Sequence, residues 1–216
     1  MATMMSALEK RRSTHDILEE YLMTGNDGHM RVDALNYGRC LRFVMLNEDK
    51  IAASRGSSHN HQAWLGGWSD HTDEVLNIAV LMYSALAATG RLLGFRLADA
   101  ILVLFWHDAE KLFKYKIGPD GEVYVVPELA EKAAQHEFRM RLLREYQVEF
   151  TEEQLVAFAL VEGENGGTYS RLKRGMNPLA AFCHICDVAS SRIWFDYPDV
   201  SGDPWPGPDR FKDEKK

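Results

Sequence analysis

The 216-residue chain has few cysteines, no excess of basic charge and no long apolar run, and each shortage excludes a class of protein. Three cysteines, Cys40, Cys183 and Cys186, are too few for the disulfide framework of a small secreted domain. A formal net charge of −7 argues against nonspecific binding to long nucleic acid. No apolar run approaches the ~20 residues that span a bilayer, and the charged residues 9–12 come too early for a signal peptide. We therefore expect a cytoplasmic protein with no membrane partner.

The hydrophobic residues, by contrast, make up 46% of the chain, which is ample for a buried core. We predict one all-α domain over residues 1–216, because neither an internal repeat nor a linker interrupts the sequence. Its core is expected over about 55–195, with N-terminal helices in 1–50 and a Pro-, Asp- and Lys-rich tail in 198–216. Cys183 and Cys186 are expected to be small core residues.

Apolar spacing predicts the helices, and turn residues predict their ends. The expected helices cover about 4–23, 32–51, 70–88 with a cap at Ser69 or Asp70, 97–113, 127–146, 151–160 and 177–195. Thr151 and Gln154 have the spacing of a capping box. Residues 115–117 and 123–126 flank a Gly-Pro-Asp-Gly turn, which indicates a small β-hairpin.

One polar pair stands out, because His107 and Asp108 follow directly on the apolar run 101–105. Burying ionisable groups beside such a run costs free energy unless a partner or a metal satisfies them. His71, just inside a predicted helix, and Asp187, among the apolar residues of the last helix, are similar candidates. Two imidazoles and two carboxylates from three helices suit a six-coordinate Mn, Fe, Co, Ni or Mg ion better than a closed zinc site.

Three segments together resemble the HD-domain metal-dependent phosphohydrolases. Residues 66–72, Gly-Gly-Trp-Ser-Asp-His-Thr, are similar to the family's Gly-Gly-Leu-x-x-His-Thr helix start. Residues 107–111, His-Asp-Ala-Glu-Lys, are similar to its His-Asp-x-x-Lys, and 177–192 resembles its final Asp-bearing helix. The resemblance covers about residues 55–194. It implies a helical bundle around a metal centre that hydrolyses phosphate esters, mostly of nucleotides or short RNA.

The resemblance also implies roles for individual residues. His71, His107, Asp108 and Asp187 correspond to the metal ligands. Asp108 would in addition hold or deprotonate the attacking water. Lys111, one turn beyond His107, is expected to meet a substrate phosphate as a point charge. Asp108 and Lys111 are therefore the predicted catalytic residues. The alternative for Lys111 is a solvent-facing lysine near a helix C-terminus.

For each of the other polar residues near these motifs, the sequence leaves two interpretations open. Arg55 and His61 precede the Gly-Gly turn and either bind the substrate phosphate or belong to an ordinary polar loop. His184 either hydrogen-bonds the ligand Asp187 or is a satisfied helix histidine. Two further groups either contact a nucleotide or serve as packing and solvent-facing residues: Trp64 and Trp68, and Tyr169, Arg171, Lys173 and Arg174.

A second metal is the least supported part of the resemblance. His136 falls where two-metal members have a histidine, but their next His-His pair corresponds here to 161–164, Val-Glu-Gly-Glu. Glu162 or Glu164 would have to substitute, and such a change alters metal preference. We therefore predict one tightly bound divalent ion, with a second, weaker site at His136, Glu162 and Glu164 as the alternative.

The predicted function is metal-dependent hydrolysis of a phosphate ester or anhydride in a nucleotide or similar small substrate. The alternatives of the same chemistry are a 3′–5′ exonuclease on short RNA or single-stranded DNA and a cyclic-nucleotide phosphodiesterase. A non-catalytic nucleotide-sensing module is the alternative of a different class. The amphipathic N-terminal helices and the hairpin leave homo-oligomer formation open.

Overall fold

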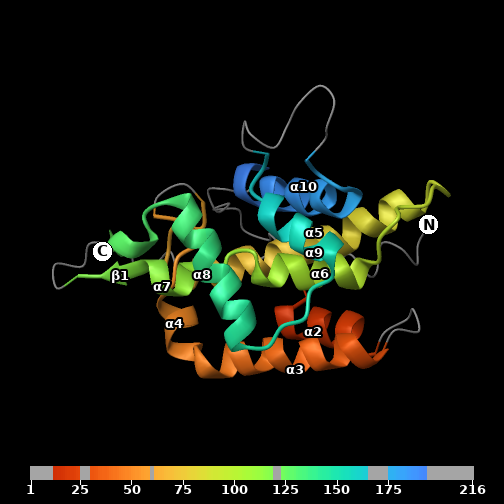
Figure 1. The fold of residues 1–216 in the computed structure, drawn as a ribbon. Helices are drawn as coiled ribbons and strands as arrows, with labels where there is room; N and C mark the ends of the chain where they lie inside the picture. The colour runs from red at the N-terminus through yellow and green to blue at the C-terminus, as the bar shows by residue number, and fades with distance from the viewer. Residues whose placement is uncertain (1–11, 25–29, 59–60, 119–122, 165–174, 194–216) are drawn as a thin grey trace.

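The computed structural model describes residues 12–24, 30–58, 61–118, 123–164 and 175–193. These residues form an assembly of helices with one small two-stranded antiparallel sheet (Figure 1), which confirms the all-α prediction with a hairpin. Within those ranges, none of the helices has both the length and the apolar character needed to cross a membrane. The predicted tail and the residues Tyr169, Arg171, Lys173 and Arg174 lie outside the described residues.

The helices and strands follow in this order: α2 Thr14–Leu18, η1 Glu19–Met23, α3 Met30–Leu46, α4 Glu48–Ala53, α5 Gly67–Ala87, α6 Leu97–Trp106, α7 Lys111–Lys114, β1 Tyr115–Ile117, β2 Val123–Val125, η2 Pro127–Leu129, α8 Lys132–Glu145, α9 Glu152–Leu160 and α10 Pro178–Ile193. η1 has π-helical and η2 has 3₁₀ geometry.

Helix α6 is the centre of the core. Nine of its ten residues, all but Asp99, are buried, so the helix is apolar on every side, as expected of a helix without a solvent face. It packs against α5, α9 and α10 on one side and against η1, α2 and α3 on the other (Figure 1). The chain segment that carries the predicted His-Asp pair therefore leaves α6 from the middle of the molecule.

Within the described residues, the helix predicted over 4–23 begins at Thr14 and continues as η1 to Met23. Ser13 caps α2, and its side chain accepts a hydrogen bond from the Asp16 backbone N–H. Thr14 then binds Asp73 of α5, with its backbone N–H 2.8 Å from the carboxylate oxygen. This contact fixes the position of α2 on α5; residues 4–11 of the predicted helix lie outside the described part.

The predicted single helix over 32–51 is divided at Asn47, which is a correction to the sequence interpretation. Asn47 is buried, and its amide donates to the Phe43 carbonyl at 2.8 Å and to the Tyr146 hydroxyl at 3.0 Å. Tyr146 is 99 residues away in the sequence. A partner so distant cannot be read from local periodicity, which explains why the break was missed.

Two other helix boundaries also differ from the prediction. The long helix begins at Gly67 after Gly66 in a left-handed conformation, and neither Ser69 nor Asp70 is its cap. The helix predicted over 97–113 ends at Trp106, and a turn over 107–110 precedes the short α7. Because this turn follows directly on the buried helix α6, His107 and Asp108 lie in the interior at the C-terminal end of α6.

The remaining elements agree with the sequence except near Pro127. The hairpin pairs Tyr115 with Val125 and Ile117 with Val123. The Thr151 capping box is present at α9, where Thr151 and Gln154 each bind the other's backbone N–H. Pro127 begins only a 3₁₀ turn, and α8 starts at residue 132, so the predicted helix over 127–146 is five residues too long at its start.

Candidate metal centre

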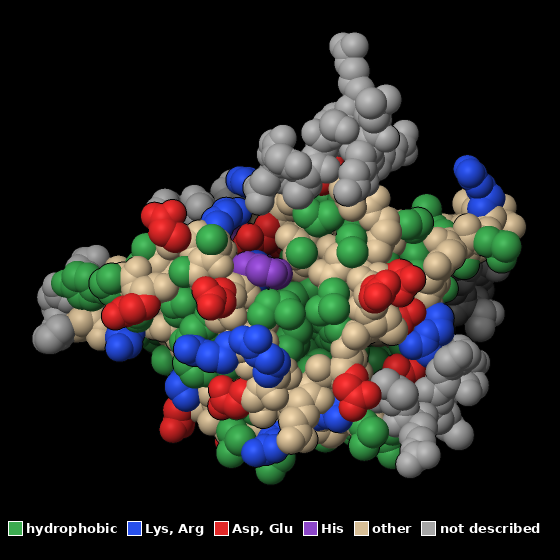
Figure 2. All heavy atoms as spheres, in the orientation of Figure 1, with side chains coloured by type: hydrophobic (Ala, Val, Ile, Leu, Met, Phe, Trp, Pro, Cys, Tyr) green, Lys and Arg blue, Asp and Glu red, His purple; other side chains and the backbone are tan. Residues whose placement is uncertain are grey.

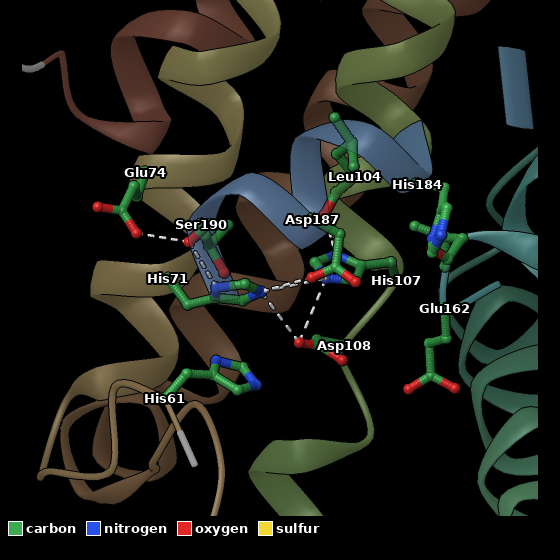
Figure 3. A network of polar contacts seen from close by, with 12 residues as sticks. His61, His71, Glu74, Leu104, His107, Asp108, Glu162, His184, Asp187 and Ser190 are labelled. Atoms are coloured by element: carbon green, nitrogen blue, oxygen red, sulfur yellow. Dashed lines mark hydrogen bonds and ion pairs between the residues drawn. The ribbon is translucent and has the colours of Figure 1, made fainter. Parts of the chain in front are cut away.

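Three segments that are far apart in the sequence bring four predicted ligands together (Figure 3). His71 comes from the first turns of α5, His107 and Asp108 from the turn after α6, and Asp187 from the middle of α10. His71, His107 and Asp108 are at most 2% exposed, whereas the Asp187 side chain is 16% exposed. The group therefore faces solvent from the Asp187 side.

The ligand atoms of this group lie at distances that one ion can bridge. His71 Nε2 is 3.4 Å from His107 Nε2 and 3.2 Å from Asp187 Oδ1. Asp108 Oδ2 lies 3.2 Å from His107 Nε2 and 3.4 Å from His71 Nε2. Two ligands bound at about 2.1 Å and at a right angle are about 3.0 Å apart. His71, His107 and Asp187 each place one ligand atom within 4.8 Å of the others, as a shared ion requires.

Hydrogen bonds on the far side of each imidazole determine which nitrogen faces the centre. His107 Nδ1 lies 2.6 Å from the Leu104 carbonyl oxygen, which can only accept, so Nδ1 carries the hydrogen. His71 Nδ1 lies 3.0 Å from the Ser190 hydroxyl, which in turn donates to Glu74. Both neutral rings therefore present a bare Nε2 to the centre, which is the orientation of a metal-binding histidine.

Four acceptors that face one another need a cation between them. In the protein without an ion, a proton supplies part of that charge. Burial disfavours the charged form of His107, but the Asp108 and Asp187 carboxylates outweigh burial and raise its pKa to about 10. For Asp187 burial is likewise outweighed, chiefly by the neighbouring His107 and His71 rings, and its pKa falls well below the usual range. The donor set fits a divalent ion, whose binding would displace the proton.

Lys111 belongs to this centre. Its ammonium nitrogen lies 2.6 Å from Asp108 Oδ2, and the residue is only 8% exposed. Burial disfavours the ammonium ion, but Asp108 outweighs that cost and raises the pKa of Lys111 above its usual value. The lysine is thus a fixed positive charge beside Asp108, and the solvent-facing alternative does not hold.

The turn that carries His107 and Asp108 is held from two sides. Trp68 of α5 donates its indole N–H to the Asp108 carbonyl at 2.9 Å. Arg139 of α8 donates to the His107 carbonyl at 2.5 Å.

Trp64, in the loop before α5, donates its indole N–H to the Asp70 carboxylate at 2.8 Å. Both tryptophans are buried and bound within the protein, so they pack and orient the site segments and are not stacking platforms for a base.

The loop before α5 brings His61 to the centre and uses Arg55 to hold the loop itself. The His61 and His71 rings have centroids 4.9 Å apart. Burial, with smaller effects of Lys111 and His71, lowers the pKa of His61 to about 4. Arg55 donates to the Ala63 carbonyl at 2.8 Å, which closes the loop. Of the two predicted substrate contacts in this loop, His61 is thus the one that lies against the predicted metal ligand His71.

The residues of the predicted second metal site have other partners. The Glu162 carboxylate lies 3.4 Å from Lys132 Nζ and 3.9 Å from Arg139 Nη2. Glu164 accepts hydrogen bonds from the backbone N–H groups of Gly175 and Met176. His136 lies with Glu162 at a cavity of about 280 Å³, lined by Lys132, Ala133, His136, Arg139, Ala159, Glu162 and Gly163. Cationic side chains already face Glu162 there, and a second ion stays a prediction.

The last helix also satisfies its own polar residues. His184 Nδ1 lies 2.7 Å from the Val161 carbonyl oxygen, so this histidine ties α10 to α9. Of the two interpretations of His184, this contact supports a helix histidine whose hydrogen bond is satisfied away from Asp187. Cys183 and Cys186 are buried in the core, as predicted. Burial raises the pKa of both thiols.

Three residues that hold the centre were missed in the sequence. Glu74 and Ser190 are buried and stand behind His71, and Gln62 joins them. A signal for two of them is present, because Glu74 lies three residues after His71 and Ser190 three residues after Asp187. On a helix, that spacing places each next to a ligand on the same face.

Comparisons of this chain with protein-family models, curated proteins and solved structures find no match.

Proposed function

We propose that this protein is a metal-dependent phosphohydrolase that acts on a nucleotide or another small phosphate ester. The observation that carries the proposal is the convergence of the bare Nε2 atoms of His71 and His107 with the carboxylates of Asp108 and Asp187. Imidazole and carboxylate with room for water suit Mn, Fe, Co, Ni or Mg. The sequence resemblance to HD-domain phosphohydrolases points to the same chemistry.

The residues around the ligands suit hydrolysis by water. A bound divalent ion would polarise a phosphoryl oxygen and lower the pKa of a coordinated water. Asp108 lies within the ligand group, 2.6 Å from the Lys111 ammonium nitrogen, and in this proposal it would hold that water and accept its proton. Lys111 offsets the negative charge that accumulates when a phosphate approaches two carboxylates. No covalent intermediate with the protein is needed.

Charge favours a small substrate over a long nucleic acid. The chain has a formal net charge of −7, and on the described residues of the face in Figure 2 basic side chains are interspersed with acidic ones. A protein that tracks a phosphate backbone usually presents a continuous basic groove. A single phosphorylated molecule requires only the local positive charge of the ion and Lys111.

The proposal is tested by phosphate release from nucleoside mono- and triphosphates, cyclic nucleotides and short oligonucleotides, each with Mn, Co, Ni or Mg. We expect turnover of one substrate class that falls at least about 1,000-fold in Asp108→Ala. Asp49→Ala, which removes an exposed aspartate of α4, is the matched control and should retain native activity. Equal turnover in Asp108→Ala, or metal-loaded native protein that turns over none of these substrates, would overturn the proposal.

A further inference from the structure

Behind His71 lies a buried network that begins at one carboxylate. Glu74 of α5 is 8% exposed, and it accepts hydrogen bonds from Ser190 of α10 and Gln62 of the loop before α5. Ser190 is fully buried and Gln62 is 2% exposed. An ionised carboxylate can only accept hydrogen bonds, whereas a hydroxyl or an amide can do either. Glu74 therefore determines the direction of the bonds that lead away from it.

The first branch leads to His71. The Ser190 hydroxyl has one hydrogen, and it is donated to Glu74 Oε2 at 2.5 Å. Its oxygen can then only accept from His71 Nδ1, which lies 3.0 Å away. The hydrogen of the His71 ring is thereby held on Nδ1, and Nε2 is left bare toward Asp187 and His107 (Figure 3).

The second branch leads to His61. The Gln62 amide nitrogen donates to Glu74 Oε2 at 2.8 Å, which fixes the orientation of an otherwise ambiguous amide. Its oxygen therefore faces His61 Nδ1 at 2.7 Å and must accept from it. The neutral His61 ring then has its hydrogen on Nδ1 and an acceptor at Nε2. Figure 3 shows this ring beside His71, extending from its loop toward the centre.

We propose that Glu74 is a positioning residue that sets the tautomers of both histidines, so that each directs an Nε2 acceptor to the centre. For His71 that acceptor is a metal ligand. For His61 it accepts a hydrogen bond from the metal-bound water or from a substrate hydroxyl, and does not donate to a phosphate oxygen. The roles at the ion rest on the proposed function, whereas the tautomers depend only on the network.

The direct test is the tautomeric state of the two rings in metal-free protein with 15N-labelled histidine, read from the Nδ1 and Nε2 shifts in long-range 1H–15N spectra. Native protein is expected to show both rings with hydrogen on Nδ1. Glu74→Gln keeps the size of the side chain but adds a donor, and we expect the Nε2–H form to appear at His61 and His71. The Kd for Mn²⁺, measured by calorimetry, should rise about 10- to 100-fold.

Two single-branch variants keep the test decisive if Glu74→Gln folds poorly. Ser190→Ala should change the tautomer of His71 alone, and Gln62→Leu that of His61 alone. Asp33→Asn is the matched control, because Asp33 is also a buried carboxylate but binds Arg96 at 2.8 Å. It should lower thermal stability and leave the tautomers and the Kd for Mn²⁺ unchanged.

The proposal is overturned if both rings keep hydrogen on Nδ1 in Glu74→Gln, or in both single-branch variants. The failure of the proposed function would look different. Native tautomers that respond to these substitutions as expected, in a protein that binds no Mn²⁺, would support the role of Glu74 and contradict the metal centre.

Discussion

At the scale of single residues, the centre concentrates buried charge, and Glu110 shows what this costs. Glu110 is 0% exposed, and its nearest cationic partner is Arg139, with Nε 3.8 Å from Oε2. Burial, opposed mainly by Arg139, raises the pKa of the Glu110 carboxyl to about 7 from an ordinary value of 4.5. A raised pKa in an acid favours the protonated form on folding. Its contribution to stability is therefore present below about pH 4.5 and is lost as the pH rises through 7.

Glu110→Gln should remove this pH dependence. A shift from 4.5 to about 7 corresponds to a loss on the order of 2–3 kcal/mol in the native protein between pH 4.5 and 8. We expect the free energy of unfolding of the variant to fall by less than that of the native protein over this range. Urea denaturation of both proteins at each pH measures the difference, in which unrelated titrations cancel. Parallel curves for the two proteins would show that Glu110 does not titrate there.

Single residues also show how far a sequence pattern reaches. His107, Asp108 and Asp187 could be picked out in the sequence because they are ionisable residues beside apolar segments, whereas His71 was indicated by its place after the Gly-Gly turn. The role of His61 was open in the sequence, since its tautomer depends on Gln62. Such roles depend on partners that come together only in the folded chain, so residue type and spacing alone cannot predict them.

At the scale of elements, the start of α5 depends on close backbone packing. Gly66 has φ 75°, a left-handed conformation that favours glycine. At Gly67 an added Cβ would lie 1.9 Å from the Gln62 carbonyl oxygen. The loop can therefore approach the helix only where no side chain intervenes, and this approach places His61 and Gln62 against α5.

Gly67→Ala should displace the loop and destabilise the fold. Because the contact is with backbone and cannot be relieved by a rotamer change, we expect a loss of about 3 kcal/mol. Gly38→Ala in α3 is the matched control, since nothing lies within 4 Å of its added Cβ. In a helix interior that change should stabilise by about 0.5–1 kcal/mol. Chemical denaturation of both variants decides, and equal effects would contradict this account of the loop.

The element boundaries also explain what local periodicity could and could not predict. Helices with one apolar face, such as α5 and α10, were placed within a few residues, and the hairpin was found from its turn. The break at Asn47 was missed because Tyr146 supports it from across the core. The turn at 107–110 was missed because His107 and Asp108 continue the helical pattern of the sequence. In the folded chain their carbonyl groups bind Arg139 and Trp68, and the helix is interrupted there.

At the scale of the whole molecule, the centre joins α5, the turn after α6, and α10. An ion bound to His71, His107, Asp108 and Asp187 would link segments that the unfolded chain separates by up to 116 residues, from 71 to 187. A ligand that binds only the folded state stabilises it in proportion to the logarithm of its concentration over Kd. Metal should therefore affect the stability of the entire fold.

Thermal unfolding with and without metal tests this coupling. At about 100 times Kd, Mn²⁺ should add about 2.7 kcal/mol, which corresponds to a rise of about 5–10 °C in Tm. EDTA should reverse the rise, and Asp187→Ala should abolish it. Arg192 lies on the same helix and is not a ligand, so Arg192→Ala should keep the shift. A shift that survives in Asp187→Ala would place the bound ion elsewhere.

A calorimetric titration of metal-free protein with Mn²⁺ tests the metal centre itself. We expect about one tightly bound ion per chain, and at least about a 100-fold loss of affinity in His71→Ala and His107→Ala. His15→Ala, which removes an exposed histidine of α2, should bind as the native protein does. No binding by the native protein, or unchanged affinity in His71→Ala, would contradict the metal centre.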